Sequence, residues 1–206
     1  MIEKVSKRIT YNLIKSKTIP ASDYELYKYG VELLISSFVG IALILITGWL
    51  FFSIFDSLIF IFCFITLRSF CGGFHANSYL KCNISSVCTF IIVSIASKFI
   101  VLNTISLTLV SCMCIFIISI FSPIENEFKP INDNERIKYK IISIIICTIF
   151  VCIALILHYY QIVISNSILF STLAISFLVI VGKITSKKRK GENHESTINT
   201  HSKSSI

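Results

Sequence analysis

Apolar residues fill most of this chain in long runs that short polar segments interrupt. A helix needs about 20 apolar residues to cross the hydrocarbon core of a membrane. Six runs approach this length, at residues 31–53, 57–70, 84–104, 105–122, 141–160 and 162–182. The second run is the shortest, because Arg68 closely follows "SLIFIFCFITL". The pattern predicts an all-α, polytopic integral membrane protein with about six membrane-embedded helices.

The first 17 residues follow a different pattern. Ile2, Val5, Ile9 and Leu13 recur at intervals of three and four, and lysines and an arginine occupy the opposite side. This spacing predicts an amphipathic helix in the membrane interface. We therefore expect three regions: an N-terminal interfacial segment (1–30), a membrane-embedded domain (31–182) and a basic, disordered tail (183–206).

The charges predict the orientation of these regions. The chain is 54% hydrophobic with a net charge of +8, and eighteen of its 19 lysines and arginines fall in residues 1–30, 68–83, 123–140 and 183–206. Six crossings place these segments on one side, which the positive-inside rule makes the cytoplasm. The basic residues flank apolar runs, so we expect a cell-membrane protein, embedded in the lipid bilayer, rather than a nucleic-acid partner. Both termini are then cytoplasmic, and Glu32 falls near the cytoplasmic end of the first span.

One polar stretch, "RSFCGGFHANSYLKC" (68–82), stands out at this cytoplasmic boundary. Polar groups at membrane depth are costly and usually functional. His75 and Cys82 form a natural pair of base and thiol nucleophile. Seven residues of straight helix rise about 10.5 Å, so the chain should bend between the two. Gly72 and Gly73 supply backbone freedom and amide donors for an oxyanion.

The same residues also fit simpler roles. Arg68 suits an ordinary cytoplasmic anchor, and the glycine pair suits a helix end. Cys71, His75 and Cys82 lack the close C-x-x-C spacing of zinc sites, so we expect no metal and no cofactor. A small multispan transporter and a metal-dependent intramembrane hydrolase are the alternative functions.

The pattern of Arg68, Gly72, Gly73, His75, Ala76 and Cys82 resembles the core motif of the accessory gene regulator protein B (AgrB) family, the membrane cysteine endopeptidases of peptide quorum sensing. The resemblance extends over nearly the whole chain in length and span layout. It implies that His75 and Cys82 are catalytic and that Arg68 and Gly73 are needed at the site. It also implies an AgrD-like propeptide as substrate, a thioester acyl-enzyme, cyclisation to a thiolactone or lactone, and a homodimer.

The propeptides of this family end in an acidic tail, which basic side chains at the cytoplasmic boundary would attract. The candidates besides Arg68 are Lys81, Lys129, Arg136, Lys138 and Lys140. For the last four, membrane orientation is the simpler explanation.

Overall fold

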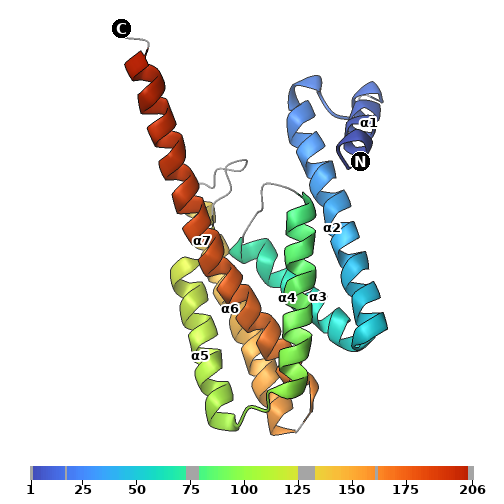
Figure 1. Ribbon diagram of the computed structural model, residues 1–206, viewed down its shortest axis with the longest axis vertical. Helices are drawn as coiled ribbons and strands as arrows, with labels where there is room; N and C mark the ends of the chain where they lie inside the picture. Colours follow the sequence, from blue (N-terminus) through green and yellow to red (C-terminus); the bar gives the residue numbers. More distant parts are fainter. Residues whose placement is uncertain (1, 17, 73–78, 125–132, 161, 204–206) are drawn as a thin grey trace. The chain divides into compact units, whose positions relative to one another are not determined.

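The computed structural model describes residues 2–16, 18–72, 79–124, 133–160 and 162–203, with side chains as far as Ser186. Within these residues the chain is helical and contains no β-strand (Figure 1). The helices are α1 (Ile2–Lys15), a short 3₁₀ helix (Ala21–Asp23), α2 (Tyr24–Phe51), α3 (Ile54–Cys71), α4 (Tyr79–Phe99), α5 (Thr104–Phe121), α6 (Asp133–Tyr159) and α7 (Ile164–Lys203).

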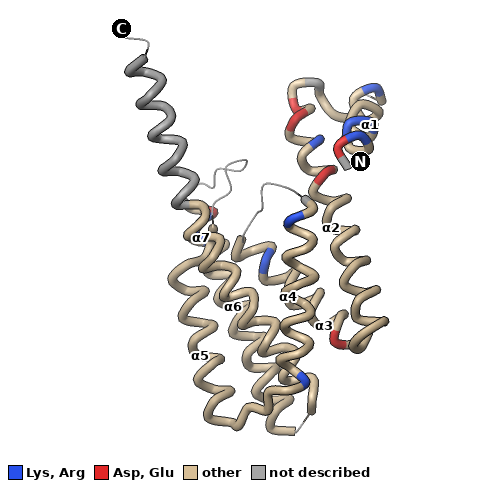
Figure 2. Tube along the Cα trace, viewed as in Figure 1, with Lys and Arg blue, Asp and Glu red and all other residues tan. Residues whose placement is uncertain are grey.

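Six of these helices, α2 to α7, are long and apolar enough to cross a membrane. This confirms the predicted polytopic all-α fold. The second span, α3, starts at Ile54 rather than at residue 57 and has 18 residues. At 1.5 Å per residue it is about 27 Å long, close to the thickness of the hydrocarbon core. Many charged residues lie near helix ends, as the first turns of α2 illustrate (Figure 2).

Several serine and threonine side chains within the spans satisfy their hydroxyl groups locally, whereas the buried hydroxyls of Ser94 and Ser111 have no hydrogen-bond partner within the described part of the chain. Many donate a hydrogen bond to the carbonyl oxygen four residues earlier in the same helix, among them Ser37, Thr47, Thr108, Thr148, Ser171 and Thr172. Hydrocarbon offers these groups no water, so a bond within the helix removes the cost of leaving them unpaired. A polar residue can therefore occur in a span without marking a site.

The chain forms two compact units. Unit 1 contains Met1–Ser57 and Ala76–Phe90, and unit 2 contains Leu58–His75 and Ile91–Ile206. Helices α3 and α4 each contribute to both units. The polar stretch at 68–82 therefore has one flank in each unit.

In unit 1 the N-terminal helix α1 packs against α2. Ser6 and Thr10 of α1 are fully buried, whereas Val5 and Ile9 are 44% and 40% exposed. The predicted amphipathic helix is thus confirmed, but it contacts α2 through small polar residues rather than through its apolar row. Val5 and Ile9 of the apolar row remain accessible, as the predicted location in the membrane interface requires.

Helix α2 buries one face whose members are four residues apart: Glu32, Ser36, Gly40, Ile44 and Gly48. At the far end of this face, a Cβ atom on Gly48 would coincide with the Ser57 side chain at the start of α3. Nearby, the rings of Phe52 and Phe90 meet edge to face with centroids 5.8 Å apart. Small residues let membrane helices approach closely, so this face sets the packing of unit 1.

Unit 2 is built around α5, α6 and α7, which pack against one another. Five of the buried residues of α7 are small and hydroxylated: Ser165, Ser167, Ser171, Thr172 and Ser176. Larger apolar side chains on the same helix, such as Leu169 and Val179, fill the space between them. Close contact through small residues again replaces the hydrophobic effect, which is absent between helices in lipid.

Helix α7 continues as far as Lys203, into the predicted tail (183–206), where the side chains after Ser186 are outside the described residues. The predicted disorder of this tail remains a prediction. The predicted boundaries of the three regions also remain predictions.

Replacing Gly48 with alanine should destabilise unit 1. Rotation of the Ser57 hydroxyl would not relieve the overlap, because the Ser57 Cβ would still lie 2.9 Å from the new methyl group. We expect a loss of about 1–3 kcal/mol, typical of overpacking. Gly30→Ala is the matched control, since nothing lies within 4 Å of its Cβ position and alanine favours a helix. Thermal unfolding in detergent, followed by circular dichroism, tests this; equal melting temperatures for both variants would contradict it.

Candidate functional site

The polar stretch at 68–82 lies where α3 ends and α4 begins. Arg68 is in the last turn of α3, which ends at Cys71, and Cys82 is in the first turn of α4, which begins at Tyr79. The stretch thus includes the end of one helix and the start of the next. The bend that we predicted between His75 and Cys82 falls mainly on residues 73–78, which are outside the described residues. His75 and Gly73 are outside the described residues.

The first flank of the motif is anchored to the segment that follows α5. The backbone N–H of Ile124 donates a hydrogen bond to the carbonyl oxygen of Cys71 over 3.0 Å. Gly72 follows with a φ of +70°. A Cβ atom on Gly72 would lie 2.7 Å from the Ile124 carbonyl oxygen. Two features therefore require glycine at position 72: the left-handed backbone conformation and the close approach of the Ile124 backbone.

The Cys71 side chain strengthens this anchor. Cys71 is fully buried, and the hydroxyls of Ser122 and Ser143 lie beside its thiol. Ser122 also donates to Ser143 over 3.1 Å, and Ser143 donates to the carbonyl oxygen of Tyr139. The sequence suggested neither serine, because serines are common in this chain and these two are 21 residues apart.

Arg68 lies one turn before the anchor and is half-buried. Its guanidinium carbon is 5.2 Å from the centroid of the Phe64 ring, a cation–π contact within α3. This contact holds a cation beside apolar surface at the end of a span. It is compatible both with a role at the site and with the simpler role of a membrane anchor.

The second flank of the motif is held by α2. Asn83, directly after Cys82, is only 6% exposed, and its side-chain oxygen accepts a hydrogen bond from Ser36 over 3.3 Å. Ser86, one turn further along α4, donates to the carbonyl oxygen of Cys82 over 3.0 Å. Cys82 itself is partly exposed, and it is the only one of the eight cysteines in this intermediate class. The structure thus fixes the backbone around Cys82 and leaves this residue partly exposed.

Glu32 lies one turn before Ser36 on the same face of α2. It is the only buried residue among the charged residues that the structure describes, with an exposed fraction of 8%. Its carboxylate accepts a hydrogen bond from Ser6 of α1 over 2.9 Å. Glu32, Ser36, Gly40 and Gly48 lie at multiples of four positions, and this spacing of small or polar residues is the sequence signal that would have revealed the face.

The predicted tail-binding residues lie at helix ends. Lys81 is exposed in the first turn of α4, and the residues exposed near the start of α6 are Arg136, Lys138 and Lys140. Lys129 is outside the described residues. Because these two groups belong to different units, the structure does not test whether they share one surface.

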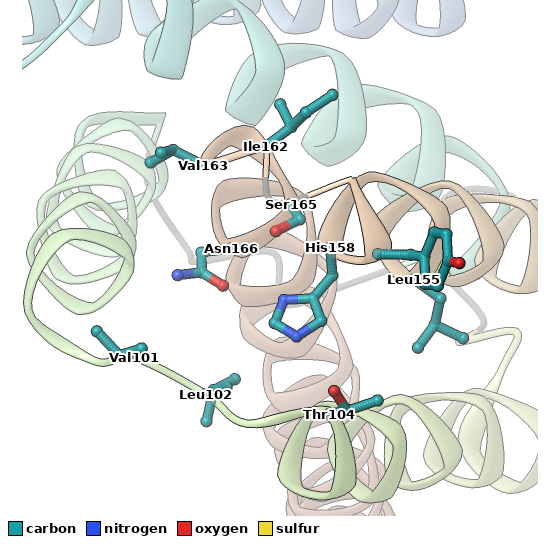
Figure 3. Close-up of a pocket in the computed structure, with 10 residues that line it drawn as sticks. Val101, Leu102, Thr104, Leu155, His158, Ile162, Val163, Ser165 and Asn166 are labelled. Atoms are coloured by element: carbon teal, nitrogen blue, oxygen red, sulfur yellow. The ribbon is translucent and has the colours of Figure 1, made fainter.

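A half-open cavity of about 540 Å³ lies at the other end of unit 2. His158, Ser165 and Asn166 surround it together with Thr104 at the start of α5 (Figure 3). The Cys71 anchor lies beyond the opposite end of α5, about 27 Å away along this helix of 18 residues. His158 therefore does not join the Cys71 flank of the motif. In the described part of the chain, no three histidine, cysteine or acidic residues are close enough to hold a metal ion.

Comparison with known proteins gives one consistent result. Residues 6–180 match the family described as Accessory gene regulator B. The chain is 30% identical over 177 residues to "Putative AgrB-like protein 2" of Clostridium perfringens (strain 13 / Type A), covering 78% of this chain and 80% of that protein. It is 29% identical over 112 residues to "Accessory gene regulator protein B" of Staphylococcus saprophyticus, covering 53% and 59%. No solved structure matches.

Replacing Gly72 with alanine should loosen the Cys71 anchor. The added methyl group meets the Ile124 backbone and forces strain onto the left-handed residue, a cost of about 1–3 kcal/mol. The buried Cys71 thiol should then react with a maleimide about tenfold faster. Mass spectrometry of the Cys71 peptide measures this rate, and Ser69→Ala, an exposed position in the same turn, is the control. Unchanged protection of Cys71 would show that the chain accommodates the methyl group without opening.

Proposed function

Because the chain belongs to the accessory gene regulator B family of peptide quorum sensing, we propose that it is a membrane-embedded cysteine endopeptidase. Its substrate is an AgrD-like propeptide, from which it removes the C-terminal tail. The remaining signal region is then cyclised to a thiolactone or lactone. The observation that carries the proposal is the motif of Arg68, Gly72, Gly73, His75 and Cys82, which falls within the residues matched by the family.

The position of Cys82, partly exposed at the start of a helix, supports its role as nucleophile. Four of the other cysteines are buried, and the remaining three are exposed on helices that span the membrane. Cys82 lies in the first turn of α4, and helical side chains tilt toward the N-terminus. The positive end of the helix dipole stabilises negative charge at this position, which an attacking thiolate carries.

The first chemical step transfers the signal region to the enzyme. His75 takes the proton of the Cys82 thiol, and the thiolate attacks the carbonyl carbon that joins the signal region to the tail. The carbon–nitrogen bond breaks, and the imidazolium returns the proton to the nitrogen of the departing tail. Backbone N–H groups near Gly72 and Gly73 stabilise the oxyanion. The product is a thioester on Cys82.

The second step releases the ring. A cysteine or serine within the propeptide attacks the thioester carbonyl, and the Cys82 sulfur leaves and regains a proton. Exchange of one thioester for another is nearly neutral in energy, whereas conversion of an amide to a thioester is uphill. Removal of the released tail must therefore draw the reaction forward. Water must be excluded, because hydrolysis would give a linear peptide, and the end of a membrane span suits this need.

The charge distribution supports a cytoplasmic site. Arg68 and Lys81 flank the motif, and Lys98 is the one basic residue at the opposite end of α4. Under the positive-inside rule the motif and both termini lie on the cytoplasmic side of the cell membrane. Lys81, Lys129, Arg136, Lys138 and Lys140 then attract the acidic tail of the propeptide. We also propose a homodimer, as the family resemblance implies.

Replacing Cys82 with alanine should abolish tail release while the protein still inserts in the membrane. The test is co-expression with an AgrD-like propeptide that carries a C-terminal epitope tag. Mass spectrometry of the unmodified enzyme should detect the signal region on the Cys82 peptide, in a linkage that hydroxylamine cleaves. Cys88→Ala, at an exposed position on the same helix, should process normally. Normal tail release by the Cys82 variant would refute the proposal.

High salt should weaken capture of the propeptide. Raising the ionic strength from 0.1 to 1 M shortens the screening length from about 10 Å to about 3 Å. We expect KM for tail release by the detergent-solubilised enzyme to rise several-fold, with kcat nearly unchanged. Replacing Arg136, Lys138 and Lys140 together with glutamine should remove most of this salt dependence. A propeptide with amides in place of the acidic tail residues is the control; an equal salt effect on both substrates would exclude charge as the cause.

A further inference from the structure

We infer that Asn83 is a positioning residue for Cys82. The amide of Asn83 seats the first turns of α4 on α2 and so fixes where the neighbouring sulfur lies. The inference rests on the proposed function, because it assigns a role to the surroundings of the proposed nucleophile. Every residue that carries it belongs to unit 1.

This seat on α2 has two parts: the hydroxyl of Ser36 and, one turn later, the space left by the absent side chain of Gly40. Ser36 and Asn83 are 4% and 6% exposed, and the Ser36 hydroxyl donates to the Asn83 side-chain oxygen over 3.3 Å. Gly40 provides the gap, because a Cβ atom at this position would lie 3.0 Å from the same oxygen and 3.7 Å from the amide carbon. The amide is thus held along α2 by the hydrogen bond and pressed against α2 at the glycine.

This seat determines the placement of the thiol because the two residues are adjacent on one rigid helix. One residue of α-helix corresponds to a rise of 1.5 Å and a rotation of about 100°. Any sliding or rotation of Asn83 on α2 therefore moves the Cys82 sulfur by a similar amount. The bond from Ser86 to the Cys82 carbonyl oxygen keeps this part of α4 together. A shift of about 1 Å at a reacting atom is enough to lower a catalytic rate by up to 100-fold.

The alternative is that Asn83 and Ser36 only stabilise unit 1. Stability alone predicts less folded protein with normal Cys82 chemistry in the part that folds. Positioning predicts folded protein with altered Cys82 chemistry. The two are distinguished by the reactivity of Cys82 relative to Cys88, an exposed thiol further along the same helix.

The experiment uses the full-length protein in detergent and iodoacetamide as the probe. The variants are Asn83→Ala, Ser36→Ala and Gly40→Ala, and Ser37→Ala is the matched control because Ser37 is exposed on α2 and bonds only within it. The alkylation rate at Cys82 is measured across pH by mass spectrometry of its peptide, with the Cys88 rate as internal reference. The kcat and KM for tail release from an AgrD-like propeptide are measured on the same samples.

We expect each of the three variants to change the Cys82 alkylation rate at least threefold and to leave the Cys88 rate unchanged. The kcat for tail release should fall about tenfold, with little change in KM. The Ser36→Ala, Asn83→Ala double variant should be no worse than Asn83→Ala alone, because both substitutions remove one interaction. Combining Asn83→Ser with Gly40→Ala should recover part of the activity, since the shorter side chain leaves space for the methyl group.

Normal Cys82 alkylation and normal kcat in Ser36→Ala or Asn83→Ala would overturn the inference, as would purely additive effects in the double variant. If Asn83→Ala does not accumulate, Ser36→Ala decides, because it removes the hydrogen bond and keeps the amide. The proposed function is tested separately. If Cys82→Ala still releases the tail, the function is wrong; if it is inactive while Ser36→Ala is normal, only the positioning role is wrong.

Discussion

A peptide group within hydrocarbon has no water to bond with, so each break between membrane helices requires a partner from elsewhere in the chain. The motif at 68–82 contains such a break, between the end of α3 at Cys71 and the start of α4 at Tyr79. On the α3 side the partner is Ile124, whose N–H bonds the Cys71 carbonyl oxygen. Without Ile124 the Cys71 carbonyl oxygen at the end of α3 would lose this hydrogen bond. The proposed chemistry therefore depends on a contact between segments about 50 residues apart.

Both flanks of the motif combine a small residue with a side-chain hydroxyl. At Gly72 the backbone of Ile124 approaches closely, and Ser122 and Ser143 surround the adjacent thiol. At Gly40 the amide of Asn83 takes the space of a missing side chain, next to the Ser36 hydroxyl. In a membrane, an apolar side chain gains little by moving from lipid to a protein neighbour. Contacts through small and hydroxylated residues therefore determine which helix faces pack together. A catalytic thiol benefits because its backbone is fixed on rigid helices.

The buried face of α2 also connects the N-terminal helix to the motif. Glu32 bonds Ser6 of α1, and Ser36, one turn later, bonds Asn83 of α4. A buried carboxylate at the end of a span is expensive, and such residues are usually retained for function. The amphipathic helix α1 is thus an integral part of unit 1 rather than an independent membrane anchor. Its accessible apolar row, Val5 and Ile9, adds a lipid contact to this role.

The sequence by itself determined the class of protein, the six spans and the composition of the motif. Run length is dictated by membrane thickness, and the spacing from Arg68 to Cys82 is a local pattern, so both can be read along the chain. The sequence placed the start of α3 at residue 57 instead of Ile54, and it did not indicate which residues of α1 contact α2. Helix ends and packing faces depend on neighbouring elements of the structure, which a local sequence pattern does not reveal. Only the tertiary structure decided that Ile124, Ser122 and Ser143 secure one flank of the motif and that Ser36 and Gly40 secure the other. These partners are distant in sequence and chemically ordinary, and they acquire a role only because close helix packing brings them within hydrogen-bonding distance.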